Sequence, residues 1–200
     1  MAERAASRAA LLALRRDRRV IEEGHRFLDE RRVALAHELL RRARDYATHR
    51  AAFTRRLEAA RRALGAAVGW HGLEGLQVLP PWRLAPAAFE QTREPYLGVT
   101  LATATRLPLA ATPDPNAVWP TSAAAQCAQA FRELAQDAGV LAGEVASLLR
   151  LMTEYRKTER RVRALENIVL PEARADERRF ESVLEELDQE EVMRSRRFAR

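Results

Sequence analysis

TERRVRALENIVLP, residues 158–171, lies near the middle of the longest helix-forming segment of the sequence. Val162, Leu165 and Val169 recur at intervals of three and four residues, which places them on one face of a helix. Charged residues fill most of the positions between them. Pro171 has no amide donor and its ring crowds the preceding turn, so we expect it to kink or locally loosen the helix without ending it.

The heptad pattern extends outward from this stretch to fill residues 121–200, with Thr121 or Ser122 as the expected N-cap. Two apolar series, each repeating every seven positions, predict the two-stripe seam of a coiled coil. One series contains Leu134, Leu141, Leu148, Tyr155, Val162 and Val169, and the other contains Phe131, Ala138, Val145 and Met152. Glu159 and Glu166 fall on seam positions, where they either pair with arginines of a facing helix or mark an opening towards a partner.

A second heptad pattern occupies residues 1–66 and predicts another long helix beginning near Ser7. Its apolar residues repeat every seven positions, apart from one four-residue insertion, a stutter that locally unwinds a coiled coil. The members are Leu11, Leu14, Ile21, Leu28 and Leu35, followed by Leu39, Tyr46, Phe53, Leu57 and Leu64. Gly24 interrupts the pattern, either for a close approach or because it is exposed. Four glycines, at 65, 69, 72 and 75, are expected to end the helix.

The intervening residues 67–120 hold eight of the nine prolines and therefore predict a break between the helices. Two short segments, 87–91 and 97–105, have the composition of strands, and residues 92–95 between them are expected to form the turn of a small β-hairpin.

The predicted fold class is mostly α, a long antiparallel two-helix coiled-coil hairpin with a small β-hairpin insert. Its expected segments are the N-terminal helix 1–66, the proline-rich insert 67–120 and the C-terminal helix 121–200. The net charge is +6, and residues 1–66 hold the excess, with 17 arginines against 9 acidic residues. Folding back would bring these arginines near the acidic residues of 181–191, which would help to set the register of the helices.

No constellation of residues predicts catalysis, metal binding or cofactor binding. The three histidines of the first helix recur every twelve residues and cannot converge on one metal ion. Cys127 is a single cysteine, which excludes an internal disulfide and fits a reducing compartment. No apolar run approaches the roughly twenty residues of a membrane span, so a soluble, cytoplasmic protein is expected.

Residues 158–171 resemble the TxRRVNALExVxIP signature of the D subunit of the V/A-type ATPases, the central rotor shaft of these motors. The residues that match and are candidates for functional contacts are Thr158, Arg160, Arg161, Val162, Leu165, Glu166 and Pro171. Ala164 and Val169 also match the signature. Arg163 stands where the family has asparagine. The first helix resembles the family more loosely, and the layout of helix, hairpin and helix is also that of the family.

The resemblance implies a non-catalytic shaft that transmits torque and couples ion flow to ATP synthesis or hydrolysis. The implied partners are the ring of A and B subunits, the small F subunit and the funnel-like C/d subunit of the membrane rotor. The implied location is peripheral, at the cytoplasmic face of a membrane and without insertion into it. A coiled-coil adaptor without a motor role is the alternative. Nucleic-acid binding is disfavoured, because the arginines are interleaved with acids and few aromatic residues accompany them.

Overall fold

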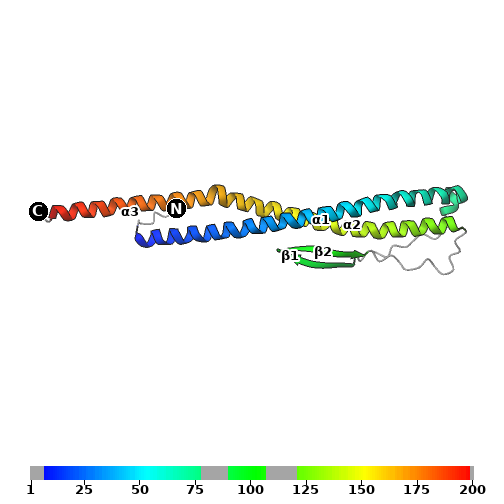
Figure 1. Ribbon diagram of the computed structural model, residues 1–200, viewed down its shortest axis with the longest axis horizontal. Helices are drawn as coiled ribbons and strands as arrows, with labels where there is room; N and C mark the ends of the chain where they lie inside the picture. The colour runs from blue at the N-terminus through cyan, green and yellow to red at the C-terminus, as the bar shows by residue number, and fades with distance from the viewer. Residues whose placement is uncertain (1–6, 78–89, 107–120, 199–200) are drawn as a thin grey trace. The chain divides into compact units, whose positions relative to one another are not determined.

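The computed structural model describes residues 7–77, 90–106 and 121–198. The elements in chain order are α1 (Arg8–Gln77), β1 (Glu90–Tyr96), β2 (Val99–Arg106), α2 (Ser122–Ala164), the π-helical segment η1 (Leu165–Val169) and α3 (Leu170–Phe198) (Figure 1). The chain forms two compact units, and each contains parts of both helical runs. We call Met1–Ala34 with Tyr155–Arg200 the terminal unit, and Leu35–Glu154 the hairpin unit.

Side-chain caps explain where both helical runs begin. Ser7 Oγ accepts a hydrogen bond from the Ala10 N–H at 3.1 Å, and Thr121 Oγ1 accepts one from the Ala124 N–H at 3.3 Å. Each hydroxyl satisfies an amide that would otherwise have no partner within the first turn. The expected start near Ser7 and the expected cap at Thr121 are therefore confirmed.

The apolar series of α1 lies on its less exposed face, as predicted. Leu35 is fully buried, and the leucines and isoleucine at 11, 14, 21 and 28 are half-buried. Alanines take over some of this role in the hairpin unit, where Ala60 and Ala67 are fully buried while Leu64 is 39% exposed. Because alanine buries little apolar area, this half of α1 gains less from packing than its leucine-rich start.

The first helix extends past its predicted end at residue 66, and of the four glycines expected to end it only Gly72 interrupts it. Residues 65 and 69 are helical glycines, and α1 continues to Gln77 across one kink at Gly72, whose φ of 69° and ψ of 167° are not helical. Helical glycines cost about 1 kcal/mol each relative to alanine. Tertiary contacts offset that cost here, because Ala67 is buried and His71 Nε2 lies 2.6 Å from Thr121 Oγ1.

One of the two predicted seam series of α2 is confirmed and the other is wrong. The series containing Leu134 is buried or half-buried along α2. Met152 and Val145 of the second series are 37% and 38% exposed, whereas Leu151 is fully buried. The second stripe is instead the series of Asp137, Glu144, Leu151, Thr158 and Leu165, all buried or half-buried. Its two acids fit at an interface because side chains of α1 pair with them.

Paired charges show that the helices run antiparallel in each unit. In the terminal unit Arg8 pairs with Asp188, Arg15 with Glu181 and Glu22 with Arg174. From one pair to the next, the residue number rises by seven on α1 and falls by seven on α3. In the hairpin unit His49 pairs with Glu144 and Arg56 with Asp137, again in steps of seven. Steps of seven on both helices are the repeat of a coiled coil.

The β-hairpin exists, but its turn lies later than predicted. Strands β1 and β2 are antiparallel, with Tyr96 opposite Val99 and a bulge after Thr92. Leu97 and Gly98, with φ of 47° and 79°, form a two-residue turn of the type that suits a hairpin. Pro95 is tolerated within β1 because its position opposite Thr100 is not hydrogen-bonded across the ladder. Residues 87–89 of the predicted first strand lie outside the described residues.

The observed elements confirm the predicted fold class of long antiparallel helices with a small β-hairpin insert. Among the described residues, no helix combines the length and the apolar character that crossing a membrane requires.

Candidate functional site

Residues 158–171 divide into an inward set and an outward set, both in the terminal unit. Thr158 and Val162 are 2% and 1% exposed, and Leu165 is half-buried. The outward set contains Arg160, Arg161, Glu166 and Pro171, all exposed. The helix therefore uses part of the motif for its own packing and presents two guanidinium groups and a carboxylate to solvent.

The acids at the predicted seam positions do not pair with a facing helix. Glu159 pairs with Arg163 of its own helix, with 2.7 Å between Nη2 and Oε1. Glu166 is exposed and has no ion-pair partner among the described residues. Arg160 is held by its own helix through a 3.3 Å bond from Nε to the Arg156 carbonyl. Among the described residues, Glu166 therefore does not form the cross-seam pair that was one of its two predicted alternatives.

The expected loosening before Pro171 is present as a π-helical segment. Residues Ala164 and Leu170 on either side of η1 keep helical dihedral angles, and the Leu170 N–H bonds to the Leu165 carbonyl five residues earlier. A π turn is wider than an α turn, so it separates the proline ring from the preceding carbonyls. The helix thus continues through the proline.

A ladder of ion pairs joins the helices of the terminal unit. Arg15 contacts Glu177 from Nε at 3.1 Å and Glu181 from Nη2 at 2.6 Å. Bonding to Glu181 is the main cause that raises the pKa of Arg15. Burial acts against ionisation of Glu22, but bonds from Arg174 and Arg18 outweigh it and lower the pKa of this carboxyl. The predicted attraction between the first helix and the acids of the last is therefore confirmed.

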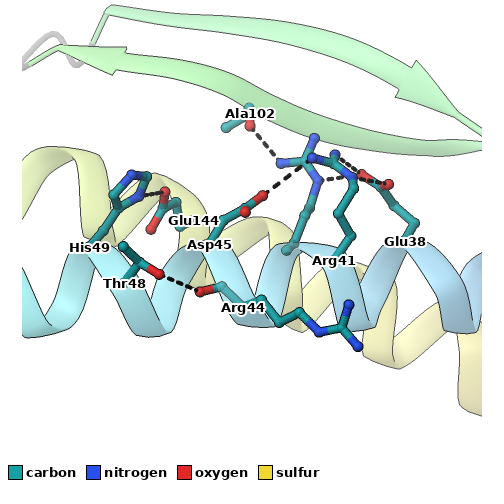
Figure 2. A network of polar contacts seen from close by, with 9 residues as sticks. Glu38, Arg41, Arg44, Asp45, Thr48, His49, Ala102 and Glu144 are labelled. Carbon is teal, nitrogen blue, oxygen red and sulfur yellow. Dashed lines mark hydrogen bonds and ion pairs between the residues drawn. The ribbon is translucent and has the colours of Figure 1, made fainter.

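A second polar network lies in the hairpin unit, beside the sheet. Figure 2 shows Glu38, Arg41 and Asp45 of α1 below the Ala102 carbonyl, with His49 directed towards Glu144 of α2. Arg41 bonds to Glu38 at 2.6 Å and to Asp45 at 3.2 Å. Hydrogen bonding from Arg41 is the main cause that lowers the pKa of Glu38. The network borders a cavity of about 430 Å³.

In both networks, acidic side chains are paired with basic ones, and neither network has the arrangement expected of a catalytic or metal site. No group of three or more histidine, cysteine or acidic side chains among the described residues could hold a metal ion. Cys127 is partly buried, and burial raises the pKa of its thiol, so it is not an activated nucleophile. The chemistry that these side chains support is fixation of one helix against another.

Sequence reasoning missed the contacts between the hairpin and the helices. Arg42 of α1 donates from Nη1 to the Ala102 carbonyl at 3.0 Å, and Ser147 Oγ of α2 accepts from the Ala102 N–H at 2.9 Å. Arg150 donates to the Thr100 carbonyl at 3.0 Å. A bond from a side chain to a distant backbone has no sequence signature, so these residues could not have been found from periodicity.

An apolar stripe on α2 is left uncovered in the hairpin unit. Phe131, Val145, Leu149 and Met152 are 38%, 38%, 60% and 37% exposed, respectively. Three of them belong to the series predicted as a seam, and Leu149 follows Val145 at the four-residue interval of a helix face. The spacing is that of a coiled-coil stripe, and all four side chains remain exposed.

Comparison with known proteins gives the family. The family model described as the D subunit of ATP synthase matches residues 10–200. The chain belongs to the ATP synthase D subunit family. It is 34% identical over 203 residues to the V-type ATP synthase D subunit of Anaeromyxobacter dehalogenans strain 2CP-1, covering 99% of this chain and 96% of that relative. The V-type ATP synthase D subunit of Thermus thermophilus is 28% identical over 200 residues, covering 98% of this chain and 88% of that protein.

Membership of the D subunit family confirms the resemblance that residues 158–171 suggested. Relatives of both genera are named as subunits of V-type ATP synthases, so the chain is a homologue of a rotary ATP synthase component. Because the match covers nearly the whole chain, it includes both helical runs and the hairpin insert together with the motif.

Proposed function

We propose that this protein is the non-catalytic central rotor subunit of a V/A-type ATPase and transmits torque between the catalytic ring and the membrane rotor. The observation that carries the proposal is the step-for-step antiparallel pairing of the helices within each unit, in a member of the D subunit family. A torque-bearing element has to resist sliding and twisting, and interlocked heptads with cross-helix ion pairs oppose both motions.

The proposed ring partners are the A and B subunits, and the proposed rotor partners are the small F subunit and the funnel-like C/d subunit. The exposed motif side chains Arg160, Arg161 and Glu166 support a contact made through charges. We assign the uncovered stripe of α2 to the F subunit, because heptad spacing of exposed apolar residues suits a third packed helix. The complex would hold the protein at the cytoplasmic face of a membrane, peripherally and without insertion.

The test of torque transmission is a single-molecule rotation assay on a reconstituted complex. The chain would be co-expressed with the A, B and F subunits of its own organism and labelled with a bead, and ATP should drive its rotation. A complex that assembles and hydrolyses ATP while the bead stays still would favour the adaptor without a motor role.

Matched arginine variants test the motif surface. Arg160 and Arg178 are both exposed, and each bonds from Nε to the carbonyl four residues earlier. Arg160→Glu should weaken assembly with the ring or the rotor partners at least several-fold, while Arg178→Glu serves as the control for the same change of charge. Equal effects of the two substitutions would remove the motif from the interface.

The F subunit assignment is tested by charging the apolar stripe. Leu149→Asp should abolish co-purification with the F subunit, because a carboxylate cannot be buried unpaired at a helix interface. Leu40→Asp is the control, since Leu40 is 55% exposed on α1 of the same unit. Undiminished capture of the F subunit by Leu149→Asp would place its binding elsewhere.

A further inference from the structure

The helix pair in the hairpin unit has a weak apolar seam. Two members of the second seam series of α2, Asp137 and Glu144, are acids, and further along α1 the fully buried side chains are those of Ala60 and Ala67. A seam that repeats every seven residues also offers nearly equivalent pairings one heptad away. Selecting a single register therefore needs a contact that occurs only once.

The sheet supplies such a contact at Ala102. This residue lies opposite Arg93 in the ladder, and both of its backbone polar groups are bonded to the helices. Its N–H donates to Ser147 of α2 and its carbonyl accepts from Arg42 of α1. One residue of β2 is thus bonded to both helices, and Figure 2 shows the Ala102 carbonyl directed towards α1.

Each partner of Ala102 is itself fixed in place. Ser147 is fully buried, and its hydroxyl donates to the Gly143 carbonyl at 3.0 Å while it accepts from Ala102. Arg42 is oriented by Glu38 of the same helix, with 2.7 Å between Nε and Oε1. Because each side chain is held by its own helix, it moves with that helix and cannot reach back to Ala102 when the helix slides.

Small residues on α2 allow the strand to come this close. Gly139, Gly143 and Ser147 follow one another at intervals of four and are all buried, so they share one face. Leu101 of β2, the residue before Ala102, is 1% exposed. The Arg150 bond to Thr100 adds a second attachment to α2 two residues along the strand.

We propose that the β-hairpin is a register staple, which fixes the axial position of α1 against α2 through the Arg42–Ala102–Ser147 contact. Sliding of either helix by one heptad would break one of the two bonds to Ala102, even though the seam itself would match again. The staple deepens the proposed function, since a shaft whose helices slide would lose part of an applied torque, but its own test does not depend on the motor.

The register is measured in the isolated full chain by the distance between two spin labels. Cys127 is replaced by serine, and the labels are placed at Thr54 and Gln136, which are exposed on α1 and α2. The unsubstituted staple should give one narrow distance distribution. Combining Arg42→Ala with Ser147→Ala should broaden it or add a second population, because one heptad corresponds to an axial shift of about 10 Å.

Amide exchange at Ala102 reports the staple without labels. Ser147→Ala removes the acceptor of the Ala102 N–H and should speed its exchange about 10-fold, the scale set by losing one neutral hydrogen bond. Thr153→Ala is the matched control, because the Thr153 hydroxyl bonds only to the Leu149 carbonyl of its own helix among the described residues. Arg42→Lys keeps the charge, so its Ala102 exchange rate should lie between the rates of Arg42→Ala and of the unsubstituted chain.

Unchanged label distances together with unchanged Ala102 exchange in the double variant would overturn the staple. If the double variant loses its helical circular dichroism, Arg42→Lys and Ser147→Ala are measured singly, and the same two readouts decide. Failure of the rotation assay with an intact staple would instead count against the proposed motor role alone.

Discussion

Arg15 of α1 donates a hydrogen bond from Nη2 to Glu181 of α3, with 2.6 Å between the two atoms although 166 residues separate them in the chain. Arg15→Glu places like charges at this point and should lower Tm by a few degrees. Adding Glu181→Arg should recover much of the loss, because the pair is then reversed. Thermal unfolding followed by circular dichroism measures both effects. Arg16→Glu, at an exposed neighbouring position, is the control, and an equal loss there would show that the pairing is not specific.

Acid should destabilise the helix pairs through Glu22 and Glu38. The pKa of each carboxyl is lowered in the folded state, so the unfolded chain binds more protons as the pH falls. The two carboxylates contribute fully to the free energy of unfolding above the unfolded-state pKa of about 4.3. This contribution is lost as the pH falls through their lower folded-state pKa values. Tm measured between neutral pH and pH 3 should decline less steeply for the double variant Glu22→Gln, Glu38→Gln. An undiminished slope in the double variant would show that these two carboxylates do not carry the acid response.

Leu151 and Leu149 provide a direct test of which face of α2 is internal. Leu151 is fully buried, so Leu151→Ala should lower the free energy of unfolding by about 2–5 kcal/mol. Leu149 is 60% exposed, and Leu149→Ala should change it by less than about 0.5 kcal/mol. Urea titration of the two variants gives both values. Similar losses at the two positions would contradict the observed seam.

Two glycines of α1 should respond to alanine in opposite directions. A Cβ at Gly24 would meet no atom within 4 Å, so Gly24→Ala should stabilise the helix by about 0.5–1 kcal/mol. A Cβ at Gly72 also has space, but the positive φ of 69° strains any residue with a side chain. Gly72→Ala should therefore lower Tm or straighten the kink, whereas Gly24→Ala should raise Tm. A rise in Tm for both would show that the Gly72 conformation is not required.

Periodicity was sufficient for the helices and insufficient for the contacts between elements. Leu35 and Leu134 could be assigned to the core because spacing alone places them on a repeating face. The second stripe of α2 was missed because Asp137 and Glu144 are charged, and only their partners on α1 explain why they can lie at an interface.

The hairpin was predicted with the wrong turn for a comparable reason. Pro95 and its neighbours have the composition of a turn, whereas Leu97 is a poor residue for positive φ. The staple residues Arg42 and Ser147 form hydrogen bonds with the backbone of Ala102. Such bonds cannot be predicted from the sequence, because every residue has the same backbone groups.

The π-helical segment shifts the heptad phase of the C-terminal helical run by one residue. Before η1 the series containing Leu134 advances by sevens to Val162, and its next member, Val169, is half-buried. Leu170, eight residues after Val162, is buried, and half-buried Glu177 and Leu184 follow it at intervals of seven. An α-helix turns about 100° per residue, so without the wider turn the later series would lie on another side of the helix. The number of residues between Val162 and Leu170 therefore has to be conserved in any chimaera or alignment. A junction that removes one residue there would rotate the buried face of α3 by about 100° relative to the preceding helix.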